Sequence, residues 1–250
     1  MQTPAAAPVA DDSEFDEALD PEVDEVFEVD IDPSLEERDL HEADEQLAQD
    51  LGEEEGVAVQ PRSIRAIAGM GKVYDYRGTG LCPPNGGRIR PLAMVHHIPV
   101  VRNAAGTADL VVLGNVLRGQ GLAIQAATDA EGNVALYTRF DELCYGQRGA
   151  NQFSCGVEHM HWDVGEAWTE KQMRAAAWCA NQVWVSYAIP PQRAILTPGS
   201  RIVGVQLRGH TSHENVSKKA GFNDRSDPGD GFDYPHLYEL TKHYNKHHRF

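Results

Sequence analysis

Hydrophobic and polar positions follow two different patterns along this chain of 250 residues. In residues 1–33, acidic residues alternate with Val and Phe, and too little apolar surface is available to offset the entropy of ordering, which predicts disorder. From about residue 61, short apolar runs typical of buried strands alternate with segments of helical spacing. This alternation predicts an α/β fold, with a central mixed sheet flanked by helices. The predicted strands are 92–100, 122–127, 134–140, 153–160 and 202–207.

The most strongly indicated helix covers residues 169–188. Thr169 and Gln172 have the spacing of a capping box, and apolar residues from Met173 to Val183 recur at helical intervals. Further helices are predicted over 108–117, over 234–243 and, as a short acidic helix that begins after Ser34, over 34–52.

The charge of the chain is divided unevenly. Residues 1–60, the acidic arm, carry 22 acidic residues and one basic residue, a net charge of -21, whereas residues 61–250 carry 16 acidic and 21 basic residues, a net charge of +5. We therefore expect a largely disordered arm over 1–60 and a folded domain over 61–250. A charge of +5 is too small to indicate nucleic-acid binding, but it suits an anionic surface such as a bacterial wall.

Targeting and cysteine patterns narrow the class of protein further. No apolar run approaches the ~18–20 residues of a membrane span, and the first residues lack the basic and apolar regions of a signal peptide, so neither is expected. The four cysteines form no CxxC pair, which argues against a disulfide scaffold or a zinc ribbon.

Histidine and aspartate gather at three places. His96 and His97 lie inside the strand at 92–100, His210 and His213 follow the strand at 202–207, and Asp227 belongs to a cluster of four aspartates just beyond. Imidazole and carboxylate are natural zinc ligands, and a catalytic zinc keeps three protein ligands and one open position. Because side chains alternate along a strand, only one of the two adjacent histidines can face such a site.

Five motifs follow one another along the chain: VHHIP at 95–99, NQFSCGVEHMHW at 151–162, TEKQMRAAAWCANQV at 169–183, GHTSHENV at 209–216 and RSDPGDGFDY at 225–234. In this order they resemble the zinc-dependent N-acetylmuramoyl-L-alanine amidase family, type 2, which includes bacteriophage lysins and is similar to peptidoglycan recognition proteins. The resemblance covers roughly residues 85–245. It implies a peptidoglycan hydrolase that uses a zinc-activated water to cleave the amide bond between N-acetylmuramic acid and L-alanine of the stem peptide. The folded domain over 61–250 would then be the catalytic domain.

The resemblance also implies a ligand set. It assigns His96 as the first zinc ligand, with His97 facing away, and Asp227, before Pro-Gly, as the third. The second ligand is expected to be His213, with His210 as the alternative, because the separation between His210 and Asp227 is long for the family.

Catalytic and substrate-binding residues follow from the same resemblance. Glu158 matches the glutamate of the family's S-I-G-I-E strand and is expected to act as general base. Arg225 stands where the family frequently has a lysine that stabilises the oxyanion, and guanidinium differs in shape from ammonium. Trp162, Tyr145 and Asn151 are expected to contact substrate.

Two other functions fit the same residues: a peptidoglycan-binding module without hydrolysis, and a zinc peptidase acting on stem peptides. The resemblance implies a phage endolysin or a virion-associated lysin, located in the host cytoplasm before release to the cell wall or carried on the virion. The acidic arm is expected to serve as a linker, to bind a partner or to mask the positively charged domain.

Overall fold

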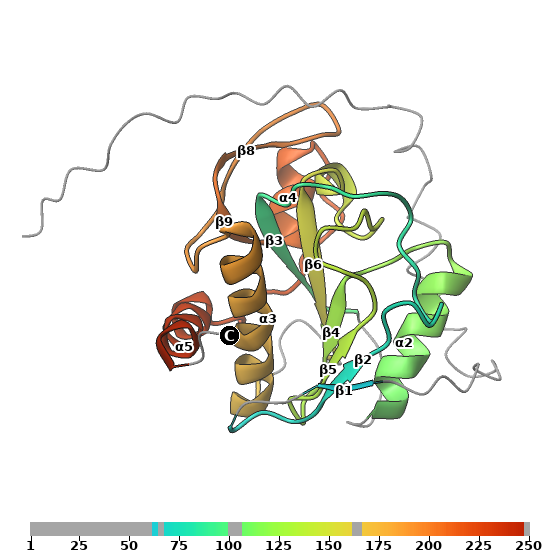
Figure 1. Cartoon of the computed structure of the whole chain (residues 1–250). Helices are drawn as coiled ribbons and strands as arrows, with labels where there is room; N and C mark the ends of the chain where they lie inside the picture. Colours follow the sequence, from blue (N-terminus) through green and yellow to red (C-terminus); the bar gives the residue numbers. More distant parts are fainter. Residues whose placement is uncertain (1–61, 65–67, 100–106, 162–166, 248–250) are drawn as a thin grey trace, which may run out of the picture. The chain divides into compact units, whose positions relative to one another are not determined.

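A computed structural model describes residues 62–64, 68–99, 107–161 and 167–247. Its centre is a seven-stranded mixed sheet in the order β1-β2-β5-β4-β6-β3-β9 (Figure 1). This arrangement confirms the predicted fold class. The acidic arm and its predicted helix lie outside the described residues. The strands of the sheet are β1 (Arg62–Ile64), β2 (Val73–Asp75), β3 (Ala93–His97), β4 (Ala126–Thr128), β5 (Val134–Leu136), β6 (Ser154–His159) and β9 (Gly209–Ser212).

The strands that matter for function are parallel neighbours. β4, β6, β3 and β9 all run in the same direction, so their carboxyl ends meet at one edge of the sheet. The register pairs His97 with Glu158 across β3 and β6. Every residue of β3 is buried, as expected for a parallel strand covered on both faces.

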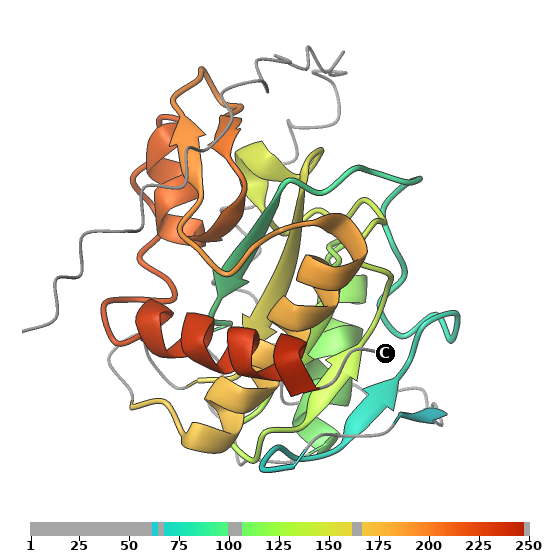
Figure 2. The same ribbon diagram turned by 60° about the vertical axis from the view of Figure 1, so that its left-hand side comes forward.

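Helices cover both faces of the sheet. On one face lie α3 (Glu170–Tyr187) and α5 (Tyr234–His247), which cross each other in Figure 2 and pack on residues such as Met94 and Val157. On the other face, α2 (Thr107–Gly119) packs through Leu110 and Leu113, and α4 (His213–Lys219) packs through Val216. The two faces therefore have separate cores.

The predicted helix at 169–188 is confirmed as α3. Thr169 is its N-cap, and its Oγ1 accepts a hydrogen bond from the Gln172 backbone N–H at 3.1 Å. The side chain of Gln172 does not complete the capping box; it hydrogen-bonds to His161 and to the Met160 carbonyl in the interior. The spacing of Thr169 and Gln172 thus predicted the start of the helix. Of the two hydrogen bonds of a capping box, only the one that Thr169 accepts is formed, and the Gln172 side chain bonds to interior groups instead.

The predicted strand at 202–207 is present, but it is not the buried strand of the central sheet that leads to the histidines. Residues Gly204–Leu207 form β8, an outlying strand that pairs with β7 (Ile195–Thr197) in a separate two-stranded sheet and is largely exposed. The buried strand is β9, which follows it. Gly209 permits this placement, because a Cβ there would lie 2.3 Å from the Gln192 carbonyl oxygen.

Candidate active site

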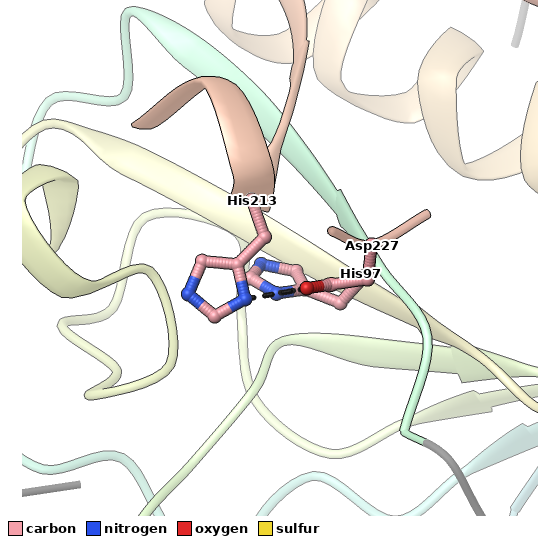
Figure 3. Close-up of side chains that lie close together, drawn as sticks. All are labelled: His97, His213 and Asp227. Atoms are coloured by element: carbon pink, nitrogen blue, oxygen red, sulfur yellow. Dashed lines mark ion pairs between the residues drawn. The ribbon is translucent and has the colours of Figure 1, made fainter. Parts of the chain in front are cut away.

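His97, His213 and Asp227 converge at the carboxyl edge of the parallel strands (Figure 3). His97 is the last residue of β3, and His213 is the first residue of α4, where the Ser212 hydroxyl caps the helix by accepting from the Asn215 N–H. Asp227 follows α4 in a loop. A strand end, a helix start and a loop therefore bring together three side chains that lie far apart in the sequence.

Their geometry suits a divalent ion. One ligand atom from each residue lies within 4.8 Å of the others, and no other group of three His, Cys, Asp or Glu side chains is this close in the part of the chain that the structure describes. Asp227 Oδ2 is 3.3 Å from His213 Nδ1 and 3.7 Å from His97 Nδ1. It also accepts a hydrogen bond from the Ile98 N–H at 3.3 Å.

Unsatisfied nitrogens support the same conclusion. The Nε2 atoms of His97 and His213 are buried and find no hydrogen-bond partner among the described residues, which is uncommon for buried polar atoms. Two imidazoles and a carboxylate form a common zinc ligand set. The donor types and their unmade interactions thus fit a metal ion.

The electrostatics of the group favour ligands in the metal-binding form. Burial, reinforced by His213, lowers the pKa of His97 to about 3, so this imidazole is neutral at physiological pH. Burial raises the pKa of Asp227, but the charge and hydrogen bond of His213 and the charge of His97 outweigh it and lower the pKa to about 2. A neutral imidazole beside a carboxylate is what metal coordination requires.

Glu158 lies beside this group on β6. Its side chain is buried, and its Oε2 atom has no hydrogen-bond partner among the described residues. Burial, followed by the negative charge of Asp227, raises its pKa well above the ordinary value. A carboxyl group with high proton affinity next to a metal-type site is suited to accept and return a proton.

A pocket of about 200 Å³ opens onto these residues. Arg225 forms part of its wall, and burial lowers the pKa of its guanidinium while the charge of Asp227 opposes this. Tyr145 also lines the pocket. The wall combines polar residues (His97, Tyr145, Glu158, His213, Arg225 and Asp227) with apolar ones (Ile98, Leu117, Leu122, Ala123 and Ile124).

The structure replaces His96 with His97 in the predicted ligand group. Consecutive residues of β3 point to opposite faces, and the face that carries Glu158 and adjoins α4 belongs to His97. His96 points toward α3 and α5, where its ring nitrogens lie 3.0 Å from His159 Nε2 and 3.0 Å from His210 Nδ1. Of the two alternatives for the second ligand, the structure brings His213 into the group, whereas His210 lies on the opposite face.

Of the residues expected to contact substrate, Asn151 lies away from the pocket. Asn151 follows η2 (Arg148–Ala150), and its Oδ1 accepts a hydrogen bond from the Gln147 backbone N–H at 2.8 Å, so it organises a turn and is not among the pocket-lining residues. Trp162 lies outside the described residues.

One feature of the sequence could have identified His97. Both faces of β3 are buried, so hydrophobicity does not distinguish His96 from His97. In parallel sheets, however, functional residues gather beyond the carboxyl ends of strands, and His97 is the residue nearer that end.

The sequence model of the N-acetylmuramoyl-L-alanine amidase family matches residues 87–230, which include the whole convergent group. The match spans more than half of the chain, and the chain therefore belongs to this family. A comparison with curated proteins found no match.

Several solved structures are similar to the fold of this chain. A selenomethionine derivative of AmpD is 17% identical, with 70% of this chain and 96% of that chain covered and a TM-score of 0.47. The amidase LysC from Clostridium intestinale is 14% identical, with 70% and 99% covered and a TM-score of 0.47. The Staphylococcus aureus hydrolase AmiA, in complex with its ligand, is 17% identical, with 75% and 95% covered and a TM-score of 0.48.

None of the helices in the described residues combines the length and the apolar character needed to cross a bilayer.

Proposed function

We propose that this chain is a zinc-dependent hydrolase of peptidoglycan that cleaves the amide bond between the lactyl group of N-acetylmuramic acid and L-alanine of the stem peptide. The observation that carries the proposal is the convergence of His97, His213 and Asp227 beside the buried Glu158, in one pocket of a chain that belongs to the amidase family. Amide hydrolysis leaves a carboxylate on the lactyl group and a free amine on L-alanine.

His97, His213 and Asp227 would hold the zinc ion. When bound, zinc supplies a Lewis acid that polarises the scissile carbonyl and lowers the pKa of a water molecule toward ~7. Ile98 supports this arrangement, because its N–H group fixes the carboxylate of Asp227. Such outer contacts orient ligands and sustain affinity.

Glu158 would act as the general base. Glu158 lines the pocket that the ligand residues share, and its Oε2 has no hydrogen-bond partner among the described residues, so its carboxyl group can take the proton of the attacking water and return it to the departing amine. The same carboxyl group thus accepts one proton from water and delivers it to the amine, so that the protons of the hydrolysis balance.

Arg225 would stabilise negative charge on the carbonyl oxygen. It lies in the pocket wall and is cationic, and preorganised donors at this position lower the barrier by stabilising the oxyanion. Where the family frequently has lysine, this chain has the forked guanidinium, which can donate two parallel hydrogen bonds. Tyr145 on the same wall would contact the substrate.

The proposal includes a division of the chain and a biological role. Residues 61–250 would form the catalytic domain, and the acidic arm over 1–60 would mask it or join it to a partner. The resemblance to lysins supports a bacteriophage endolysin or virion-associated lysin that acts on the wall after release. Deleting residues 1–60 should strengthen wall binding at low salt if the arm is a mask, and unchanged binding would exclude that role.

The products of wall digestion test the proposed reaction. The full chain, loaded with zinc, is incubated with isolated cell walls, and the soluble fragments are analysed by mass spectrometry. Muramic acid with a free lactyl carboxylate, together with stem peptides that begin with a free L-alanine amine, supports the amidase. New termini within the stem peptide would instead identify a peptidase. Binding to the walls without any release would identify a binding module.

A further inference from the structure

A second cluster of histidines lies on the face of the sheet opposite the proposed zinc site. His96, His159 and His210 are fully buried beneath α3 and α5. His96 Nε2 lies 3.0 Å from His210 Nδ1, His96 Nδ1 lies 3.0 Å from His159 Nε2, and His159 Nδ1 lies 2.8 Å from the Thr128 hydroxyl. We call this continuous chain of hydrogen bonds the imidazole ladder.

The ladder crosses the four parallel strands in turn. His210 is on β9, His96 on β3, His159 on β6 and Thr128 on β4. Neighbouring rings are stacked with centroids 5.3 Å apart on each side of His96, and the ring planes differ by 12° and 22°. Strands of parallel sheets normally carry apolar side chains on both faces. A row of hydrogen-bonded imidazoles is therefore not what packing of the sheet against helices requires.

The chemistry of neutral imidazole gives the ladder a direction. Each inner nitrogen of the ladder lies within hydrogen-bond distance of its neighbour, and a neutral imidazole carries one N–H and one lone pair. Every ring can therefore donate one bond and accept one. The ladder ends at His210 Nε2, which is buried without a partner among the described residues. All three rings must hold matching tautomers and positions for the hydrogen bonds to form.

Each member of the ladder lies close in sequence to a residue of the active site. His96 precedes His97, and His159 follows Glu158. His210 leads along β9 to Ser212, which caps the helix that begins at His213. Strand alternation places each ladder residue and its neighbour on opposite faces of the same backbone, so a shift of one strand would displace both.

We infer that the imidazole ladder fixes the relative positions of β9, β3 and β6 and thereby holds His213, His97 and Glu158 at the spacing that the metal site needs, which makes His96 a positioning residue. This inference rests on the proposed function. Hydrophobic side chains could fill the same volume, but their contacts do not specify direction or register, whereas a hydrogen-bonded chain does.

The test compares two buried histidines within the full chain. His96→Phe keeps an aromatic ring but removes both ladder hydrogen bonds. His161→Phe is the matched control, because His161 is also buried beside Trp168 and hydrogen-bonds to Gln172 on α3, but it is not a member of the ladder. Zinc affinity is measured by chelator competition, thermal unfolding by calorimetry, and wall hydrolysis as kcat and KM.

His96→Phe should weaken zinc affinity by about 10-fold, the lower end of what loss of an outer contact to a metal ligand produces, and should lower kcat more than KM. His161→Phe should lower the unfolding temperature without changing zinc affinity. Equal loss of affinity in both variants, or none in His96→Phe, would overturn the inference. If His96→Phe does not fold, Thr128→Val provides the milder break at the end of the ladder, with a smaller loss of affinity expected and an unchanged affinity counting against the ladder.

A second measurement separates this inference from the proposed function. In the metal-free protein, nuclear magnetic resonance of ¹⁵N-labelled histidine should show nitrogen–nitrogen couplings across the His210–His96 and His96–His159 hydrogen bonds. Their absence would remove the ladder even if the chain hydrolyses peptidoglycan. Their presence in a chain that binds no zinc would leave the ladder intact and contradict the proposed function.

Discussion

The two faces of β3 carry histidines of equal burial and opposite character. His97 on one face and His96 on the other are both essentially inaccessible to solvent. His97 lies beside a carboxylate, opens onto a pocket and keeps an unsatisfied nitrogen. Both nitrogens of His96 are hydrogen-bonded to other imidazoles, and its ring packs 4.7 Å from that of Phe232.

Burial and residue type therefore do not distinguish a metal ligand from a structural histidine. An unsatisfied nitrogen alone does not distinguish them either, because His210 Nε2 on the face of His96 is also buried without a hydrogen-bond partner among the described residues. An adjacent carboxylate and access to a pocket are what set His97 apart from His96. Substitutions of single residues on either face would test this distinction.

Removal of His97 should have the largest effect. His97→Ala takes away one of three ligand side chains, so bound zinc should be lost on dialysis and hydrolysis should fall by at least about 10³-fold, because activation of the attacking water is lost with the metal. Metal content by atomic emission and the rate of wall hydrolysis measure the two effects. A chelator added to the unaltered chain should reproduce the loss, and re-addition of zinc should restore activity to that chain alone. A variant that keeps stoichiometric zinc would remove His97 from the ligand set.

Replacement of Glu158 should separate catalysis from metal binding. Glu158→Gln keeps the size of the side chain but removes its capacity to accept a proton, so kcat should fall by about 10²–10⁴-fold. Zinc content should stay that of the unaltered chain, since Glu158 is not part of the ligand group. Steady-state hydrolysis of a soluble muramoyl peptide gives kcat, and near-normal turnover would rule out Glu158 as the base.

Substitution of Arg225 should lower the rate of hydrolysis less than substitution of His97 or Glu158. The loss should depend on the positive charge of the side chain. Arg225→Ala removes the cation from the pocket wall and should lower kcat by about 10²-fold, the scale of losing one oxyanion donor. Arg225→Lys serves as the matched variant, and it should recover most of the rate because an ammonium group can occupy the same place. If Arg225→Ala raises KM and leaves kcat unchanged, the guanidinium binds substrate and does not stabilise the oxyanion.

The sequence predicted those elements whose local pattern carries its own hydrophobic signature. The strands β3 and β6, the hairpin of β4 and β5, and the helix α3 all appear close to their expected positions. β9 could not be predicted in this way, because its residues, Gly209–Ser212, contain no large apolar side chain. They are buried because the strand pairs with β3 in the assembled sheet. β8, by contrast, has an alternating apolar pattern that a half-exposed outlying strand shares with a core strand.

The sequence predicted that histidine and aspartate side chains would form one site, but it did not predict every member of the group. Order and spacing of motifs pointed to His213 and Asp227, which the structure brings together, and to Glu158 beside them. The choice between His96 and His97 depends on which face of β3 meets α4, and that is a property of the assembled sheet. The imidazole ladder has the same origin, because residues on four strands meet only after the sheet forms.

The smallest expected effect concerns the helix that covers the ladder. Thr169→Ala removes the hydroxyl that caps α3 at Gln172 and donates to the Ala130 carbonyl at 2.7 Å, which should cost about 1 kcal/mol of unfolding free energy. Urea denaturation measures this loss, and Thr169→Ser, which keeps the hydroxyl, should show little of it. Zinc affinity should stay unchanged in both variants, because the cap lies outside the hydrogen bonds between the strands. A weakened zinc affinity in Thr169→Ala would mean that the general stability of this face, and not the ladder, sets the geometry of the site.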